Sequence, residues 1–250
     1  SQAADVTVTS ADENGGSGLA STVFTIDGGA TTCGDALAAL AEGSHTYVAT
    51  ATDAAGNSAS ASYTWLVDTV APTVSINGPA TPNSSDSASF TVTSADASSG
   101  LASTTCTLDT VAVTCGDGAS GLSDGSHDYV ATATDDAGNS ASASHTWLVD
   151  TTDPSVSITA NPDAETNSQS ASFTFSTSDG GSGLATITCD LDGSSAACTD
   201  SASYTNAAEG SHTFTVTATD DVGNDASAAY TWLIDITDPT VSISDTPAAE

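Results

Sequence analysis

The chain has 250 residues, including no lysine, no arginine and 32 acidic residues, and its formal net charge is −32. Because lysine and arginine supply most contacts to phosphate groups, their absence makes nucleic acid and anionic membrane surfaces poor partners, and we expect no nucleic acid to bind. No apolar run approaches the roughly 20 residues of a membrane-spanning helix, and no targeting peptide is visible. We therefore expect no membrane insertion.

Hydrophobic residues make up 38% of the chain and alternate with polar ones, which predicts folded strands rather than disorder. The first predicted strand is Val6–Ser10. The best helix candidate is Asp35–Gly43, which has room for one or two turns at most. In the middle of the chain the predicted strands are Pro72–Ile76, Ala88–Asp96, Ser103–Asp109, Val111–Cys115, His127–Asp135 and Asn139–Asp150. Short alternating runs separated by turn residues predict an all-β sandwich.

Four short motifs recur three times along the chain, which indicates internal repeats. They are Gly-Leu-Ala at Gly18, Gly100 and Gly183; Asp-x-x-Gly-Asn at Asp53, Asp135 and Asp220; Glu/Asp-Gly-Ser-His at Glu42, Asp124 and Glu209; and the tryptophans Trp65, Trp147 and Trp232. The tryptophans are 82 and then 85 residues apart, so one repeat has about that length.

The string GSHTYVATATDAAGNSASASYTWLVDTVAPTVSI, which begins at Gly43, resembles the bacterial immunoglobulin-like (Big-type) tandem repeats of large surface adhesins and extracellular filaments. The resemblance extends over essentially the whole chain. It implies tandem immunoglobulin-like β-sandwiches arranged head to tail. In that family such modules are stalks and extenders of cell-surface proteins, and some bind calcium between modules.

The repeat boundaries that we predict are 1–68, 69–150 and 151–235, followed by a first strand in 236–250. Repeat 1 lacks its first strand, and the strand at the end of the chain has no sandwich behind it. Two interpretations stay open. The chain is either a window on a longer continuous array, or a subunit that donates its last strand to the next subunit. In both, the partner is another copy of the repeat, head to tail in a filament.

Four of the five cysteines form two pairs, each with a spacing of nine residues: Cys106 with Cys115, and Cys189 with Cys198. Cysteine pairs on adjacent strands of a secreted repeat predict disulfides, and no zinc-type spacing competes. Cys33 has Phe24 where its partner would stand. We therefore expect Cys33 to be a buried free thiol, with an intermolecular link as the alternative.

Acidic residues gather at each repeat boundary in an immunoglobulin-like arrangement. Carboxylates that converge without lysine or arginine repel one another, and calcium would relieve the repulsion. The expected inter-module calcium ligands are Asp68, Asp96 and Asp135; Asp150, Asp153, Asp179 and Asp220; and Asp235, Asp238, Asp12 and Asp53. Glu42, Asp124 and Glu209 lie on loops at the opposite pole of each module and are further candidates. The alternative is that these aspartates only hydrogen bond the backbone of their own turns.

No catalytic constellation stands out. His45, His127 and His212 recur at one equivalent position, which indicates a structural hydrogen bond rather than one catalytic centre. We expect no enzyme, and apart from calcium no cofactor. Asn83 begins a sequon and is a candidate for N-glycosylation. The expected function is a structural segment of an extracellular or cell-surface filament or adhesin stalk. The alternatives are a glycan- or receptor-binding module, and an accessory array of a secreted hydrolase.

Overall fold

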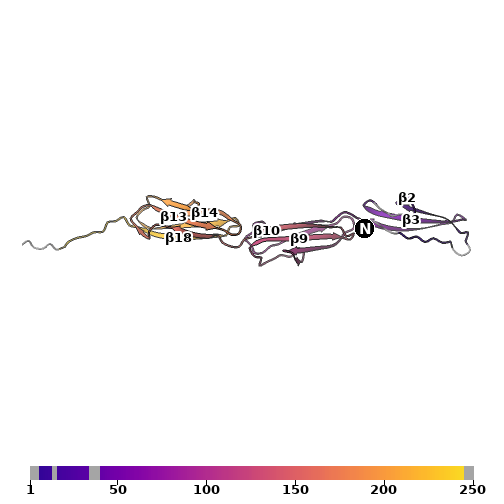
Figure 1. Ribbon diagram of the computed structural model, residues 1–250, viewed down its shortest axis with the longest axis horizontal. Helices are drawn as coiled ribbons and strands as arrows, with labels where there is room; N and C mark the ends of the chain where they lie inside the picture. Colours follow the sequence, from indigo (N-terminus) through magenta and orange to yellow (C-terminus); the bar gives the residue numbers. More distant parts are fainter. Residues whose placement is uncertain (1–5, 13–15, 34–39, 245–250) are drawn as a thin grey trace, which may run out of the picture. The chain divides into compact units, whose positions relative to one another are not determined.

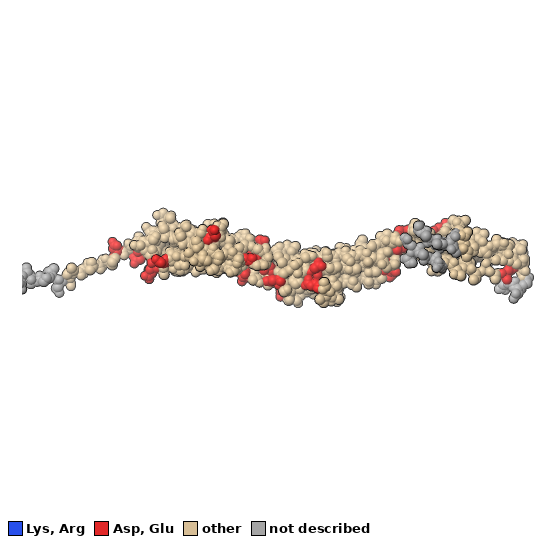
Figure 2. Space-filling view, viewed as in Figure 1, with Lys and Arg blue, Asp and Glu red and all other residues tan. Residues whose placement is uncertain are grey.

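A computed structural model of the protein describes residues 6–12, 16–33 and 40–244. Every regular element in these ranges is a β-strand, as Figure 1 shows. No helix among these residues is long and apolar enough to cross a membrane. The helix expected over Asp35–Gly43 lies largely outside the described residues, and Gly43 is the first residue of a strand. Figure 2 shows carboxylate side chains but no lysine or arginine, as the composition requires.

The strands follow the three repeats in chain order. Repeat 1 contains β1 (Leu19–Ile26), β2 (Gly29–Thr31), β3 (Gly43–Asp53) and β4 (Ser58–Val67). Repeat 2 contains β5 (Thr73–Asn77), β6 (Thr91–Ala95), β7 (Leu101–Leu108), β8 (Val111–Val113), β9 (Gly125–Asp135) and β10 (Ser140–Val149). Repeat 3 contains β11 (Ser155–Ala160), β12 (Glu165–Thr166), β13 (Ala171–Ser178), β14 (Leu184–Leu191), β15 (Ser194–Ala197), β16 (Ser201–Tyr204), β17 (Gly210–Asp220) and β18 (Asp225–Ile234). Each predicted strand of repeat 2 is present.

By its internal packing the chain divides into two compact units. One comprises Ser1–Asn77, Phe90–Asp117 and Asp128–His145. The other comprises Gly78–Ser89, Gly118–His127 and Thr146–Glu250. Repeat 1 therefore belongs to the first unit and repeat 3 to the second, while repeat 2 contributes residues to both.

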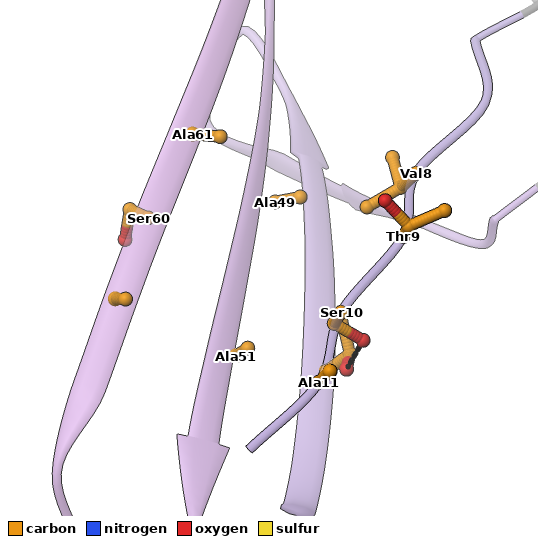
Figure 3. Close-up of a pocket in the computed structure, with 10 residues that line it drawn as sticks. Val8, Thr9, Ser10, Ala11, Ala49, Ala51, Ser60 and Ala61 are labelled. Atoms are coloured by element: carbon orange, nitrogen blue, oxygen red, sulfur yellow. Dashed lines mark hydrogen bonds between the residues drawn. The ribbon is translucent and has the colours of Figure 1, made fainter. Parts of the chain in front are cut away.

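Repeat 1 forms a four-stranded sheet in the order β2-β1-β3-β4. Val6 and Val8 pack against Tyr47 and Ala49 of this sheet. The segment Val6–Ser10, which we predicted as a strand, runs beside the sheet but belongs to no strand (Figure 3). That prediction is wrong because a strand needs a hydrogen-bonded neighbour. The described residues of repeat 1 offer this segment none, whereas β6 pairs with β5 and β13 pairs with β11.

The Gly-Leu-Ala triplets mark one irregularity that all three repeats share. Gly18, Gly100 and Gly183 have φ angles of 84°, 89° and 94°, which a residue with a side chain rarely adopts. In the following strand the pairing register shifts directly after the leucine, as between Leu184 and Thr186. The motif is therefore a turn glycine followed by a β-bulge.

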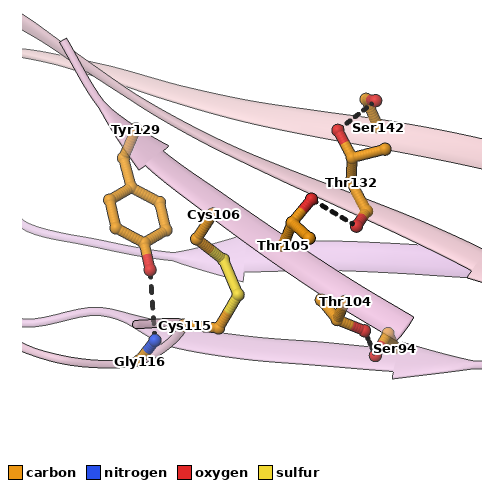
Figure 4. The surroundings of a disulfide bond; sticks show 9 residues. All are labelled: Ser94, Thr104, Thr105, Cys106, Cys115, Gly116, Tyr129, Thr132 and Ser142. Atoms are coloured by element: carbon orange, nitrogen blue, oxygen red, sulfur yellow. Dashed lines mark hydrogen bonds between the residues drawn. A yellow bond between two sulfur atoms is a disulfide. The ribbon is translucent and has the colours of Figure 1, made fainter. Parts of the chain in front are cut away.

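Both predicted disulfides are formed, Cys106 to Cys115 and Cys189 to Cys198. Figure 4 shows the first of them beside Tyr129, whose hydroxyl accepts a hydrogen bond from the Gly116 N–H at 3.1 Å. In the chain-entropy model each bond closes a loop of about ten residues and stabilises its repeat by roughly 2–3 kcal/mol.

Cys33 is a free thiol, and it is exposed. The expectation that it is buried is therefore wrong. Phe24, which stands where a partner cysteine would be, packs instead against Tyr47, with ring centroids 6.0 Å apart. Cys33 itself comes two residues after the end of β2, beyond the edge of the paired strands.

Repeat 3 shows the complete sandwich. One sheet has the order β11-β13-β16 and the other β12-β18-β17-β14-β15. Phe173 from the first sheet stacks on Phe214 from the second, with centroids 4.1 Å apart. Trp232 is only 2% exposed and packs in the same core, 5.2 Å from Phe173. Trp147 is 1% exposed, so in repeats 2 and 3 the tryptophan of the recurring Trp-Leu-Val/Ile-Asp sequence is a buried core residue, whereas Trp65 of repeat 1 is half-buried.

Candidate metal centres at the linkers

Three aspartates from separate segments converge where repeat 1 leads into repeat 2, within the first unit. Asp68 follows β4, Asp96 follows β6, and Asp135 is the last residue of β9. One carboxylate oxygen of each lies within 4.8 Å of the corresponding oxygens of the other two. Asp68 is 5% and Asp135 is 1% exposed. Because the chain has no lysine or arginine, this buried charge has no fixed cationic partner of either kind.

The same arrangement recurs where repeat 2 leads into repeat 3, within the second unit. Asp150 follows β10, Asp179 follows β13, and Asp220 ends β17. Their ligand oxygens again lie within 4.8 Å of one another. Asp150 is 0% and Asp220 is 2% exposed. The first group is the one expected from the sequence, and the second contains three of the four aspartates expected there, without Asp153.

Part of this carboxylate chemistry serves the local turns. Oδ1 of Asp220 accepts hydrogen bonds from the backbone N–H groups of Val222, Gly223 and Asn224 at 2.9, 2.7 and 2.8 Å. The Asp-x-x-Gly-Asn motif is thus an aspartate-capped hairpin turn, as the alternative interpretation expects. Each carboxylate oxygen has two lone pairs, and Oδ2 of Asp220 accepts only from the side-chain amide of Asn224, so this oxygen keeps acceptor capacity for a cation.

Asp179 is the residue that the local turn leaves incompletely bonded. Its Oδ2 accepts hydrogen bonds from the N–H groups of Gly181 and Gly183 at 3.0 and 2.7 Å. Its Oδ1 is buried from solvent and has no hydrogen-bond partner among the described residues. A buried carboxylate oxygen without a donor is costly unless a cation or water satisfies it. This oxygen therefore fits a hard, oxygen-binding ion such as calcium.

Hydrogen bonds keep the two linker aspartates ionised. The hydroxyl of Ser99 lies 2.5 Å from Oδ2 of Asp68 and lowers the pKa of that carboxyl below its usual value. Burial raises the pKa of Asp150, but hydrogen bonds from Ser182 and from the Thr152 N–H outweigh burial and leave it lowered. Both groups therefore carry full negative charge at neutral pH.

The asparagine of Asp-x-x-Gly-Asn has a role that sequence reasoning missed. The Nδ2 of Asn224 donates to the backbone carbonyl of Asp150 at 3.1 Å and to Oδ2 of Asp220 at 2.7 Å. Asn139 makes the same pair of bonds, to the carbonyl of Asp68 and to Asp135. This asparagine therefore ties the incoming linker to the last hairpin of the following repeat. The one sign of this role in the sequence is that the asparagine recurs in all three copies of the motif, as Asn57, Asn139 and Asn224.

The acid of Glu/Asp-Gly-Ser-His holds the same linker from the preceding repeat. Asp124 accepts hydrogen bonds from the N–H of Thr151 at 2.8 Å and from the hydroxyl of Thr152 at 2.5 Å. Glu42 accepts from the N–H of Thr69 at 2.9 Å in the same way. Glu209 accepts from the hydroxyl of Thr237 at 2.7 Å. These three acids therefore accept hydrogen bonds from the linker that follows their own repeat, and they are not members of the three-aspartate groups.

The other expected calcium ligands are not brought together. Asp153, Asp235 and Asp238 are exposed and belong to neither group. Asp12 and Asp53 line one open cavity of about 210 Å³ in repeat 1. The structure describes no group of three ligand residues that includes either of them.

The recurring histidine is a structural hydrogen bonder. Nδ1 of His212 lies 2.7 Å from Oδ2 of Asp192, and Nε2 lies 2.8 Å from the carbonyl of Ala208. His45 makes the equivalent contacts with Asp27 and Ala41. The candidate glycosylation residue Asn83 is half-buried, and its side-chain oxygen accepts a hydrogen bond from the Ser85 N–H at 3.2 Å.

Among solved structures, the chain is similar to the fibronectin(III)-like modules of Clostridium thermocellum CbhA, with 17% identity, a TM-score of 0.38, and coverage of 65% of this chain and 94% of that one. It is also similar to a tetra-tandem repeat from the extending region of a large adhesion protein, with 23% identity, a TM-score of 0.32, and coverage of 86% of this chain and 66% of that one. A third similar structure comes from a 1.5-MDa bacterial ice-binding adhesin, with 18% identity, a TM-score of 0.37, and coverage of 85% of this chain and 84% of that one. No curated protein matches the sequence.

A family comparison addresses the resemblance seen in the sequence. Residues 35–119 match the family model of the bacterial Ig-like domain (group 3). This range includes the whole of the string beginning at Gly43 on which the resemblance rests, and it covers β-strands of both repeat 1 and repeat 2. Over residues 35–119 the chain is thus similar to the bacterial Ig-like domain, and every element described in that range is a β-strand.

Proposed function

We propose that the chain is a structural segment of an extracellular filament or adhesin stalk. In this proposal the immunoglobulin-like repeats follow one another head to tail, and the linkers between them are stiff. The observation that carries the proposal is that the linkers after repeats 1 and 2 are each hydrogen bonded by both the preceding and the following repeat. Asp124 of the preceding repeat bonds Thr151 and Thr152, and Asn224 of the following repeat bonds the carbonyl of Asp150. A linker fastened at both ends transmits force and orientation rather than acting as a flexible coil.

Composition and covalent chemistry support an extracellular location. Disulfides persist in oxidising compartments, and this chain has two. The absence of lysine and arginine leaves no cleavage position for trypsin-like proteases. Both features suit a protein that stays exposed outside the cell.

Calcium is the cation that we propose for the two aspartate groups. Calcium prefers six to eight oxygen ligands, among them carboxylates and backbone carbonyls. Asp150, Asp179 and Asp220 supply three carboxylates, and the buried Oδ1 of Asp179 lacks another partner in the described chain. A bound ion would neutralise the mutual repulsion of the carboxylates and fasten the linker from a third direction.

Small-angle X-ray scattering on the chain in calcium tests the stalk proposal. We expect the profile of a stiff rod. The double variant Asn139→Ala/Asn224→Ala is expected to shorten the maximum dimension and to raise the high-angle Kratky profile. Asn57→Ala is the matched control, because Asn57 bonds Asp53 of its own turn and no linker among the described residues. A wild-type chain as flexible as the double variant would rule out the proposal.

A further inference from the structure

In repeat 3 one short strand runs in the same direction as the strand beside it. β12 pairs parallel with β18, with Glu165 opposite Leu233 and Thr166 opposite Ile234. The other strand pairs of this sheet are all antiparallel. The parallel contact therefore joins an early segment of the repeat, which follows β11, to the last residues of the same repeat.

Three hydrogen bonds cross this contact, all donated by β18 or by the residue after it. The Tyr230 hydroxyl donates to the Pro162 carbonyl at 3.0 Å, the Leu233 N–H to the Ala164 carbonyl at 2.9 Å, and the Asp235 N–H to the Thr166 carbonyl at 2.9 Å. Ile234, which stands between the last two donors, is 0% exposed. The contact therefore lies at the border of the hydrophobic core rather than in an exposed loop.

Repeat 2 has the same contact at the equivalent place. Asn83 pairs parallel with Val149, which is 0% exposed. Three hydrogen bonds again cross the contact: the Leu148 N–H to Oγ1 of Thr81 at 3.1 Å, the Asn83 N–H to the Leu148 carbonyl at 2.9 Å, and the Asp150 N–H to the Asn83 carbonyl at 2.9 Å. Residues 81–83 read TPN and residues 164–166 read AET, so the fold and not a shared motif places this contact.

A pull along the chain loads the parallel contact in shear. In repeat 3 the pull reaches β12 from the side of β11 and leaves β18 through Asp235, so the two parallel segments are drawn in opposite directions along their common axis. Hydrogen bonds between strands run across that axis, so all bonds of the contact carry the load together. In the antiparallel hairpin of β17 and β18, by contrast, a pull that opens the strands from their free ends breaks the bonds one at a time.

Asp150 brings the load of its linker directly to the contact in repeat 2. Its backbone N–H donates to the carbonyl of Asn83 in the same repeat at 2.9 Å. Its own carbonyl accepts a hydrogen bond from Nδ2 of Asn224 in the next repeat at 3.1 Å. The two backbone polar groups of one residue therefore serve two repeats, and tension from repeat 3 arrives first at the end of β10 that the parallel contact holds.

We propose that the parallel contact is the mechanical clamp of repeats 2 and 3, which holds each repeat folded under tension until its three hydrogen bonds break together. The clamp consists of residues 162–166 with 230–235 in repeat 3, and of residues 81–83 with 148–150 in repeat 2. It gives the chain a function beyond length and stiffness, namely resistance to extension by force.

This inference deepens the proposed stalk function and rests on it for its biological role, because a stalk is loaded along its length. Its physical content is separate. Each clamp lies within one repeat, so it requires neither calcium nor a stiff linker. The experiment is therefore done in the presence of chelator.

Single-molecule force spectroscopy on the full chain, held by its two ends, tests the clamp. The unfolding events of repeats 2 and 3 are recognised by their disulfides, each of which keeps a loop with ends nine residues apart out of the path of the tension. Because an extended residue spans about 3.4 Å, reduction is expected to lengthen each of these events by roughly 25 Å.

Asn83→Pro removes the N–H that bonds Leu148 and leaves the sequence of β10 unchanged. The loss of one of three hydrogen bonds is expected to lower the unfolding force of repeat 2 by roughly a third or more. Asn83→Ala is the matched control, because it removes the side chain but keeps the N–H, and it is expected to unfold at a force close to that of wild type. An unchanged force in Asn83→Pro, or an equal loss in both variants, would overturn the proposal.

Tyr230→Phe keeps the test decisive where the proline variant does not fold. It removes only the hydroxyl that bonds Pro162 and is expected to lower the unfolding force of repeat 3. Tyr204→Phe removes the same group from β16, outside the clamp, and is expected to leave that force unchanged. Equal forces in the two tyrosine variants would refute the clamp in repeat 3. Either result leaves the scattering test of linker stiffness unaffected, because that test reads the linkers between folded repeats.

Discussion

The side-chain amide of Asn224 lies 3.1 Å from the backbone carbonyl of Asp150, although the two residues are 74 positions apart. The same amide donates to the carboxylate of Asp220. One asparagine therefore connects the end of one repeat to the last hairpin of the next. Asn139 and Asp68 repeat the relationship in the first unit.

Replacing Asn224 with alanine is expected to destabilise repeat 3. The carbonyl of Asp150 and the buried carboxylate of Asp220 would lose their shared donor, at a cost of roughly 1–3 kcal/mol. Differential scanning calorimetry is expected to show the transition of this repeat at a Tm lower by several degrees. Asn57→Ala removes the same turn bonds in repeat 1 without a linker carbonyl, so it is expected to cost less; equal losses would argue against the linker role.

Removing one carboxylate from an aspartate group is expected to remove one calcium site. Isothermal titration calorimetry with wild-type chain is expected to show two sites, and Asp179→Asn only one. At a calcium concentration about 100 times the Kd, binding stabilises the folded state by roughly 2.7 kcal/mol, so chelator is expected to lower the Tm. Asp163→Asn, at an exposed acid outside both groups, is the charge-matched control. An unchanged Tm with calcium and with chelator would exclude this role.

Gly181 lies against the linker carboxylate. A Cβ atom built on it would stand 2.3–2.4 Å from the carboxylate atoms of Asp150, whereas one on Gly180 would meet nothing within 4 Å. Gly181→Ala is therefore expected to displace Asp150 and to cost roughly 1–3 kcal/mol, with weaker calcium binding. Gly180→Ala is expected to be close to neutral. Thermal melts of the two variants side by side would decide, and similar Tm values would refute the close approach.

The ion pair between His212 and Asp192 makes stability depend on pH. Hydrogen bonds to Asp192 and to the Ala208 carbonyl raise the pKa of His212, so its contribution is full below the unfolded value of 6.5 and is lost as pH rises through the raised folded pKa. Burial raises the pKa of Asp192, but the hydrogen bonds from His212 and Thr213 leave it lowered, so that contribution is lost in acid. We expect the Tm difference between wild type and His212→Gln to be larger at pH 5.5 than at pH 8.5. A difference that does not change with pH would contradict the charged pair.

Reduction of the disulfides is expected to act on two repeats only. Cys106–Cys115 and Cys189–Cys198 lie in repeats 2 and 3, whereas repeat 1 has the single free thiol Cys33. Dithiothreitol is expected to cost each of the disulfide-bonded repeats roughly 2–3 kcal/mol and to leave the melting transition of repeat 1 unchanged, which provides an internal control. A uniform shift of all transitions would point to a general effect of the reductant.

The sequence by itself determined the all-β fold, the strands of repeat 2, both disulfides and the grouping of Asp68 with Asp96 and Asp135. These features depend on alternation, on spacing and on a motif written three times, which are local or periodic properties of the chain. The fastening of the linker by Asn224 and Asp124, the exposure of Cys33 and the loss of strand structure at Val6–Ser10 were decided only by the tertiary structure. They depend on which distant backbone groups arrive beside a side chain and on whether a strand finds a neighbour. Such encounters are fixed when the sheets pack, because no local pattern records the position of a partner some 70 residues away.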